Sequence, residues 1–208
     1  MPCVVEVSHP LIKHHLVRLR DKTTSPPEFR LLTGRLAVLL AYEATKDLPT
    51  EATTVETPIA QADGERLSQR IGLVPILRAG LGMVDPVLNL IPDAEVWHLG
   101  LYRDEETATP VEYYSKIPPE RPVDLALILD PMLATGGSAA LAIQHMVHRN
   151  VPSIKLLSII ASREGIERVS RDFPNTTIYV CTVDAELNRD KFIVPGLGDA
   201  GDRIFNTQ

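Results

Sequence analysis

The sequence has few of the residues that cross-link a chain or send it to a membrane. Its 208 residues include two cysteines, Cys3 and Cys181, far apart, so neither a disulfide framework nor a C-x-x-C metal site is expected. No window holds the ~18 apolar residues of a membrane-spanning helix. The start, MPCVVEVSHP, lacks the basic and apolar parts of a secretory signal. We therefore expect a cytoplasmic protein without a membrane partner.

Positive charge is also in short supply. The chain has 21 Lys and Arg against 27 Asp and Glu, a formal net charge of -6, which argues against a surface that collects nucleic acid. Hydrophobic residues make up 44% of the chain and charged residues 23%, ordinary values for a globular fold. Since 208 residues suit one α/β domain, we expect residues 1–208 to form a single domain.

Helical spacing of apolar residues predicts two helices near the N-terminus. Ser25, Pro26 and Glu28 mark the start of the second as an S-x-x-E capping box with proline at the first helical position. The apolar residues at helical spacing are Leu11, Ile12, Leu16 and Leu19, followed by Phe29, Leu32, Leu36, Leu39 and Leu40. We interpret residues of about 9–47 as a helical extension that serves as scaffold.

From Ile71 onward, short apolar runs alternate with helical segments, which is typical of parallel strands covered on both faces. The predicted strands are IGLVPIL, VDLALILD, SIKLLSIIA and TIYVCTV, and EVWHLGLY and VEYYSK are predicted to pair as an arm around RDEETATP. The β-α-β-α-β order from about residue 123 to 184, within a core of about 50–184, indicates an α/β, mostly parallel, doubly wound sheet. The tail, about 185–208, is expected to be irregular and to be ordered by packing near a site.

The segment LILDPMLATGGS carries the strongest chemical signal. In open α/β sheets, ligands bind at the carboxyl ends of strands, so Asp130 is expected at the edge of a site. The following Ala134–Ser138 loop leads into a helix N-terminus, where glycines and free N–H groups favour a phosphate. The alternative is an ordinary strand-to-helix turn with a hydroxyl cap. A Walker A loop is excluded because there is no lysine, and the G-x-G-x-x-G at 196–201 lies too near the C-terminus for a dinucleotide fold.

Four segments, VPILRAGLGM, GLYRDEETATPVEYYSKIP, LILDPMLATGGS and VPGLGDAGDR, resemble the uracil phosphoribosyltransferase family in their order and separation. The resemblance covers nearly the whole chain, including FRLLTGRLAVLLAYEATKDLP. It implies a type I phosphoribosyltransferase fold and a pentosyltransferase activity in pyrimidine salvage. Phosphoribosyl would pass from 5-phospho-α-D-ribose 1-diphosphate (PRPP) to uracil, giving UMP and diphosphate. It also implies Mg²⁺ as cofactor and a homodimer or larger homo-oligomer, and some members of the family respond to GTP as an effector.

The resemblance also implies roles for residues of this chain. PRPP is assigned to Arg78, Arg103, Asp130, Pro131, Met132, Leu133, Ala134, Thr135, Gly136, Gly137, Ser138 and Asp199. Uracil, read by a backbone turn of the tail, is assigned to Ile193, Gly198, Asp199 and Ala200. Arg78, Arg103 and Asp130 are the expected catalytic residues, because guanidinium groups neutralise a departing diphosphate and a carboxylate can bind ribose hydroxyls.

Other expectations concern the metal and the neighbouring residues. Many phosphoribosyltransferases have two adjacent acids at this strand end, whereas Pro131 follows Asp130 here, so the ribose relies on one carboxylate. We expect no firm protein ligand for Mg²⁺, which PRPP would mainly hold, near Asp199. Asp202 and Arg203 are expected to pair with each other, and no histidine is assigned a catalytic role.

Two alternative functions remain open from the sequence. The first is the same transfer to another base, such as hypoxanthine or orotate. The second is a regulatory protein that keeps the fold and binds nucleotide or RNA without turnover. The acidic balance of the chain weakens the RNA version, and the complete set of Arg78, Arg103, Asp130 and the tail turn weakens the inactive version.

Overall fold

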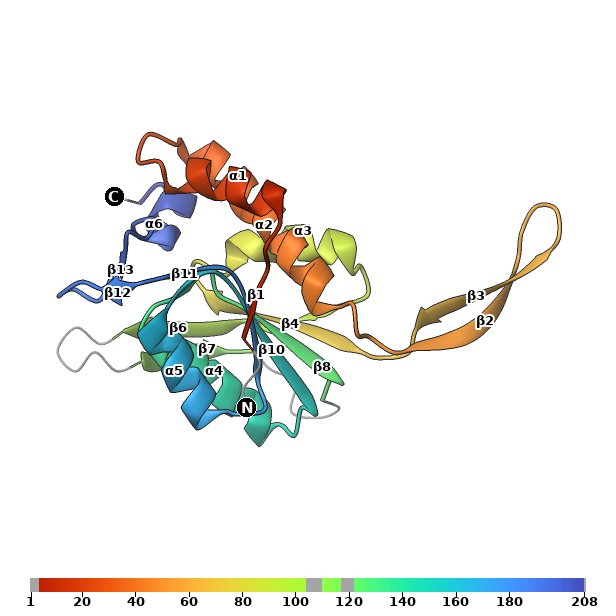
Figure 1. The fold of residues 1–208 in the computed structure, drawn as a ribbon. Coiled ribbons are helices and arrows are strands. Elements are labelled where there is room, and N and C mark those ends of the chain that lie inside the picture. The colour runs from red at the N-terminus through yellow and green to blue at the C-terminus, as the bar shows by residue number, and fades with distance from the viewer. Residues whose placement is uncertain (1–3, 104–109, 117–121, 208) are drawn as a thin grey trace.

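The computed structural model describes residues 4–103, 110–116 and 122–207 (Figure 1). The helices are α1 (Pro10–Arg20), α2 (Pro26–Ala44), α3 (Leu81–Leu90), α4 (Gly137–His148), α5 (Arg163–Asp172) and α6 (Ala200–Phe205). The strands of the central sheet are β1 (Val4–Glu6), β4 (Ile71–Leu77), β5 (Glu95–Val96), β6 (Leu99–Arg103), β7 (Pro110–Ser115), β8 (Leu125–Leu129), β9 (Met132–Leu133), β10 (Ser153–Ser162) and β11 (Thr177–Asp184). Two hairpins lie outside it, β2 (Thr50–Glu56) with β3 (Gln61–Leu67), and β12 (Glu186–Leu187) with β13 (Ile193–Val194).

The central 9-stranded sheet has the order β1-β11-β10-β8-β4-β6-β7, with β5 beside β4 and β9 beside β10. Its described pairs are parallel except β6 with β7, which is antiparallel. The doubly wound sheet predicted from the sequence is therefore confirmed. The predicted arm is confirmed as an antiparallel pair, although residues 104–109 lie outside the described residues.

Helices cover both faces of this sheet, with α1, α2 and α3 on one side and α4 and α5 on the other (Figure 1). Because apolar side chains pack on both faces, all five residues of β8 are buried. On the first side Phe29, Leu36 and Leu40 of α2 are buried, as their helical spacing predicts. In the described part of the chain, no helix has both the length and the apolar character needed to cross a bilayer.

The start of α2 differs in detail from the prediction. Ser25 is the N-cap residue and Pro26 is the first helical residue, as expected, but the Ser25 side chain makes no capping hydrogen bond. The Glu28 carboxylate instead pairs with Arg18 of α1. The predicted capping box is therefore wrong, because an arginine from the neighbouring helix is within reach of the glutamate.

Two parts of the chain have more regular structure than the sequence indicates. The β2–β3 hairpin, which was not predicted, projects from the body of the molecule (Figure 1). Its strands, TEATTVE and QADGERL, lack an apolar alternation because nearly every residue is exposed. The tail is not irregular as expected, since it contains β12, β13 and α6.

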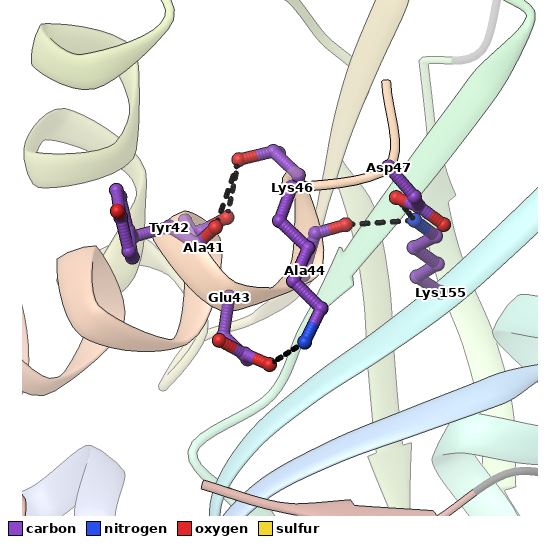
Figure 2. Close-up of polar contacts among 8 residues, drawn as sticks. Ala41, Tyr42, Glu43, Ala44, Lys46, Asp47 and Lys155 are labelled. Atoms are coloured by element: carbon purple, nitrogen blue, oxygen red, sulfur yellow. Dashed lines mark hydrogen bonds and ion pairs between the residues drawn. The ribbon is translucent and has the colours of Figure 1, made fainter. Parts of the chain in front are cut away.

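A buried lysine fixes the end of α2 to the sheet. Figure 2 shows Lys155 of β10 pointing at the last turn of α2, where its Nζ donates to the carbonyl oxygen of Ala44 at 2.7 Å and to Oδ1 of Asp47 at 2.5 Å. The Lys155 side chain is 8% exposed. Its hydrogen bond is the largest cause that lowers the pKa of Asp47. The amine thus satisfies a helix-terminal carbonyl that water does not reach easily.

Replacing Lys155 with methionine is expected to lower the free energy of unfolding by about 1–3 kcal/mol, because the Ala44 carbonyl loses its partner. Thermal and urea unfolding measure the effect, at roughly 2–4 °C of Tm per kcal/mol for a chain of this size. The matched control is Lys46→Met, since Lys46 is 63% exposed and pairs with Glu43 on the same turn (Figure 2). That change is expected to stay within about 0.5 kcal/mol. Equal losses in the two variants would contradict this interpretation.

Candidate active site

Several of the predicted site residues lie at the carboxyl ends of the parallel strands, on one side of the sheet. Strands β4, β8, β10 and β11 run parallel, so their carboxyl ends face the same way. Pro75 is in register with Leu129, which places the loop carrying Arg78 beside the residue that follows β8, Asp130. Ser162 and Asp184, at the ends of the next two strands, are also in register. This is the edge at which open α/β sheets bind ligands.

Contacts with α5 orient the loop after Asp130. The carbonyl oxygen of Ala134 accepts a hydrogen bond from Ser162 Oγ at 2.5 Å, and that of Thr135 accepts one from Arg168 Nη1 at 3.5 Å. In a planar trans peptide, the C=O and the next N–H point in opposite directions. The N–H groups of Thr135 and Gly136 therefore face away from α5.

Two glycines allow this loop to pack closely on α5. Gly136 is the N-cap residue of α4 with φ 75°, and a Cβ there would lie 2.9 Å from the carbonyl oxygen of Gly165. A Cβ on Gly165 would lie 2.4 Å from the carbonyl oxygen of Ala134. A side chain at either position would push the loop out of place, so the glycines are needed for the loop's own packing as well as for access by a ligand.

The N–H groups that follow form an open run. Ala134 N–H donates to the carbonyl oxygen of Met132 at 3.2 Å, so the run does not begin at Ala134, where the sequence placed it. From Thr135 to Ala139, no backbone N–H has a hydrogen-bond partner among the described residues. The groups lie at the N-terminus of α4, where the helix dipole favours an anion. The geometry suits a phosphate group.

Asp130 lies beside this run in a poorly solvated position. Desolvation raises the pKa of its carboxyl to about 7, and a hydrogen bond from the Met132 N–H, at 3.4 Å, opposes the rise. Among the described residues, no lysine or arginine forms an ion pair with Asp130. A carboxylate held without a cation favours a ligand that brings hydroxyl donors or a cation with it.

Arg78 connects the end of β4 to the tail. It follows a cis Leu77–Arg78 peptide bond. Its Nη2 lies 3.2 Å from Asp202 Oδ1 and its Nη1 lies 3.4 Å from Thr207 Oγ1, while its side chain remains 56% exposed. The nearby Gly80 is closely packed, since a Cβ there would lie 2.4 Å from the carbonyl oxygen of Leu129. The guanidinium is therefore held over the strand edge but remains open to solvent and ligand.

The predicted pair of Asp202 with Arg203 is wrong. Asp202 instead pairs with Arg78. Arg203 donates to three carbonyl oxygens, those of Leu197 and Leu19 at 2.8 Å and that of Asp21 at 2.6 Å. Residues adjacent in a helix point in different directions, so these two side chains reach different partners.

The tail turn exposes backbone where the resemblance places the base. Gly198 is exposed with φ 79°, and its N–H and C=O have no hydrogen-bond partner among the described residues. Asp199 caps α6, its Oδ1 accepting from the Asp202 N–H at 2.9 Å. Ile193 and Ala200 are both 3% exposed, so their side chains belong to the core wall behind the turn. The structure thus brings the tail turn close to Arg78 through Asp202.

The structure describes less of Arg103 and of any metal site. Arg103 is the last residue of β6, in register with Pro110, and its side chain lies outside what is described. Within residues 4–103, 110–116 and 122–207, no cluster of three or more His, Cys, Asp or Glu side chains could enclose a metal ion.

Sequence reasoning missed the residues that hold the site in shape. Ser162, Arg168 and Gly165 orient the loop after Asp130. Arg203, which the sequence placed near the tail turn but paired with Asp202, holds that turn through the Leu197 carbonyl. Ser162 stands at a strand end, so the argument that selected Asp130 could have found it. No local pattern identifies Arg168 or Arg203, because their acceptors are backbone carbonyls of other segments.

A doubly wound sheet that presents an acidic strand end, an open N–H run and an arginine at one edge defines a phosphoribosyltransferase of type I fold. The chain belongs to the uracil phosphoribosyltransferase family, since the family model of that description matches residues 5–207. The type I fold implied by the sequence resemblance is therefore confirmed.

Individual relatives agree with this family. The chain is 53% identical over 207 residues to the uracil phosphoribosyltransferase of Roseiflexus sp. (strain RS-1), covering 100% of both. It is 53% identical over 203 residues to that of Thermus thermophilus, covering 97% of this chain and 98% of the relative. The solved structure of the AQ2163 protein from Aquifex aeolicus superposes with a TM-score of 0.94 at 39% identity, covering 99% of each chain.

Proposed function

We propose that the protein transfers the 5-phosphoribosyl group of PRPP to uracil, giving UMP and diphosphate in pyrimidine salvage. The observation that carries the proposal is the run of N–H groups from Thr135 to Ala139, in the loop that follows Asp130, which have no hydrogen-bond partner among the described residues. A sugar phosphate fits this run because the N-terminus of a helix favours an anion. Membership of the family supports uracil as the acceptor base.

The ribose phosphate is held by the loop from Asp130 to Ser138. Backbone N–H groups and the hydroxyls of Thr135 and Ser138 bind the 5-phosphate, and the ionised Asp130 carboxylate accepts hydrogen bonds from the ribose hydroxyls. These contacts fix C1 of the ribose relative to the incoming base. Much of the rate enhancement then comes from positioning.

Arginine side chains stabilise the departing diphosphate. The bond from C1 to the diphosphate oxygen breaks while the bond from C1 to N1 of uracil forms and the N1 proton of uracil is released to water, so negative charge grows on the leaving group. Arg78 and Arg103 bind that charge. Mg²⁺ would be held mainly by the oxygens of PRPP, with the carboxylate of Asp199 available as a hard oxygen ligand, and the ion would supply further positive charge to the diphosphate.

Uracil is recognised by the tail turn. Its O2, N3–H and O4 edge alternates acceptors with a donor, and the free N–H and C=O of Gly198 can pair with an acceptor and the donor. Ile193 and Ala200 form the wall behind this turn, and Asp199 caps α6 by accepting a hydrogen bond from the Asp202 N–H. A neutral base thus needs no charged side chain for recognition.

A panel of bases tests the proposal directly. Nucleotide and diphosphate formation from PRPP are measured with uracil, orotate and hypoxanthine. Uracil is expected to exceed the other two by about 100-fold or more in kcat/KM, because a site built from fixed donors and acceptors rejects a mismatched base. Preferred turnover of hypoxanthine or orotate would establish the other-base alternative, and nucleotide binding without turnover would favour the regulatory one.

We further infer that residues 1–208 act as one phosphoribosyltransferase domain, since the extension of about 9–47 and the tail of about 185–208 share contacts around the same turn.

A homodimer or larger homo-oligomer is expected, with exposed apolar side chains such as Leu11 and Leu31 at an interface. Sedimentation with and without GTP tests the oligomer and the effector, and a strict monomer would contradict the first. A cytoplasmic location and the absence of a nucleic-acid partner stay predictions.

A further inference from the structure

The ion pair of Arg20 with Asp184 binds the backbone N–H and C=O of Gly196, a residue of the tail turn. Arg20, the last residue of α1, donates from Nη1 and Nη2 to the two carboxylate oxygens of Asp184, at 2.8 and 2.6 Å. Its Nη1 also donates to the carbonyl oxygen of Gly196 at 2.7 Å. The Gly196 N–H donates to Asp184 Oδ2 at 3.1 Å. We call Arg20 and Asp184, with the backbone of Gly196, the Arg20 clamp.

The clamp is poorly exposed and geometrically restrictive. The Asp184 side chain is 6% exposed and that of Arg20 is 24% exposed. Burying two charges costs free energy that an apolar pair would not cost, so such a pair is a weak source of stability. A bidentate arginine–carboxylate pair does, however, fix direction, because its planar groups must face each other.

The clamp acts at the point where the chain turns toward Gly198. Gly196 has φ 61°, and a Cβ there would lie 2.0 Å from the carbonyl oxygen of Ile193, so the chain passes tightly against itself. Arg20 donates a hydrogen bond to the Gly196 carbonyl oxygen, and Arg203 donates one to the Leu197 carbonyl oxygen at 2.8 Å. Since C=O and the next N–H oppose each other in a trans peptide, the Gly198 N–H points away from Arg203.

We propose that Arg20 and Asp184 are positioning residues for the acceptor base, because they hold the Gly196 backbone and, together with Arg203 on Leu197, set the direction in which the Gly198 backbone meets uracil. This inference rests on the proposed function. It gives the N-terminal helix α1 a part in base binding, whereas the sequence indicated only a scaffold. Neither side chain is expected to touch uracil or PRPP, so the effect of Arg20 and Asp184 on uracil binding is indirect. The effect is specific to the base because it acts through the Gly198 backbone.

The test uses two conservative variants of the full chain, Arg20→Lys and Asp184→Asn. Lysine keeps the charge but cannot bind both carboxylate oxygens and the Gly196 carbonyl in one plane. Asparagine keeps the shape but offers one acceptor oxygen where the carboxylate offers two. In both, the KM for uracil is expected to rise, so that kcat/KM for uracil falls roughly 10- to 100-fold, as for a small misplacement of a reactant.

Three controls separate positioning from a general loss of structure. PRPP binding without uracil, measured by titration calorimetry, is expected to change less than about twofold, since the loop after Asp130 has its own supports in Ser162 and Arg168. The matched control Arg18→Lys, on the same turn of α1 and paired with Glu28, is expected to keep the KM for uracil. Thermal unfolding verifies that each variant is folded.

The outcomes distinguish the clamp from the proposed function. If the wild type forms UMP and both folded variants keep its KM for uracil, the positioning role of the Arg20 clamp is overturned and the proposed function still holds. Equal losses of uracil and PRPP affinity would overturn it too, because they indicate a purely structural pair. If one variant does not fold, the other decides. A wild-type protein without UMP formation would overturn both the function and the clamp.

Discussion

Replacing Arg78 with alanine is expected to lower kcat for UMP formation by about 100-fold or more, the effect of removing one fixed donor from a developing negative charge. In the free protein the Arg78 guanidinium binds Asp202 and Thr207 weakly, at 3.2 and 3.4 Å, and is 56% exposed. A diphosphate can therefore displace Asp202 at small cost. Steady-state diphosphate release measures the change.

Two further variants define what Arg78 contributes. Arg78→Lys keeps the positive charge but loses the planar fork, so we expect an activity between those of wild type and Arg78→Ala. Arg66→Ala, which removes an exposed arginine of β3 paired with Glu51, is expected to leave kcat unchanged. An Arg78→Ala activity within about threefold of wild type would exclude Arg78 from the catalytic step, because a lost donor normally costs far more.

Asp130→Asn is expected to remove most activity and to abolish the acidic limb of the pH profile. In wild type, burial raises the pKa of Asp130 to about 7, so its carboxyl is protonated below that pH and ionised above it. If the ionised form binds the ribose hydroxyls, kcat/KM for PRPP rises about tenfold per pH unit up to about pH 7 and then levels off. The asparagine variant should show a low value without this rise.

Asp130→Asn is expected to lower activity but to raise the stability of the folded protein at high pH. Asp130 has a pKa of about 7 in the folded protein, against 3.8 for an unperturbed aspartate, so the folded state holds the proton more tightly. Stability from this group is then lost as pH rises between those two values. Asp130→Asn is expected to raise Tm at pH 8 and to change it little near pH 4. A lower Tm at pH 8 would contradict the poor solvation of an ionised Asp130 that has no cationic partner among the described residues.

Much of the architecture follows from local pattern. The apolar run LALIL forms the buried strand β8 and IGLVPIL forms β4, because both faces of these strands are covered and every position can be apolar. Asp130 lies at a carboxyl end for the same reason. The β2–β3 hairpin escaped prediction because neither of its faces is buried, so no apolar alternation marks it.

Side-chain partners were harder to predict than strands. Glu28 was expected to cap its own helix and pairs with Arg18, and Asp202 was expected to pair with Arg203 and pairs with Arg78. In each case the side chain pairs with a residue that tertiary packing brings close, and not with the candidate partner nearest in sequence. Spacing along a helix indicates which residues share a face, but it does not indicate which other segment lies against that face.

The sequence by itself determined the order of the buried strands and their helices, the acidic strand end at Asp130 and the glycine loop behind it, since these depend on hydrophobic period and on local backbone freedom. Only the tertiary structure decided which carbonyls of the loop and the tail are bound, and therefore which N–H groups remain open to a ligand. Arg20 and Asp184 are 164 positions apart, and only packing of α1 beside the end of β11 brings them together. Such contacts depend on the relative placement of whole elements, which residue spacing does not encode.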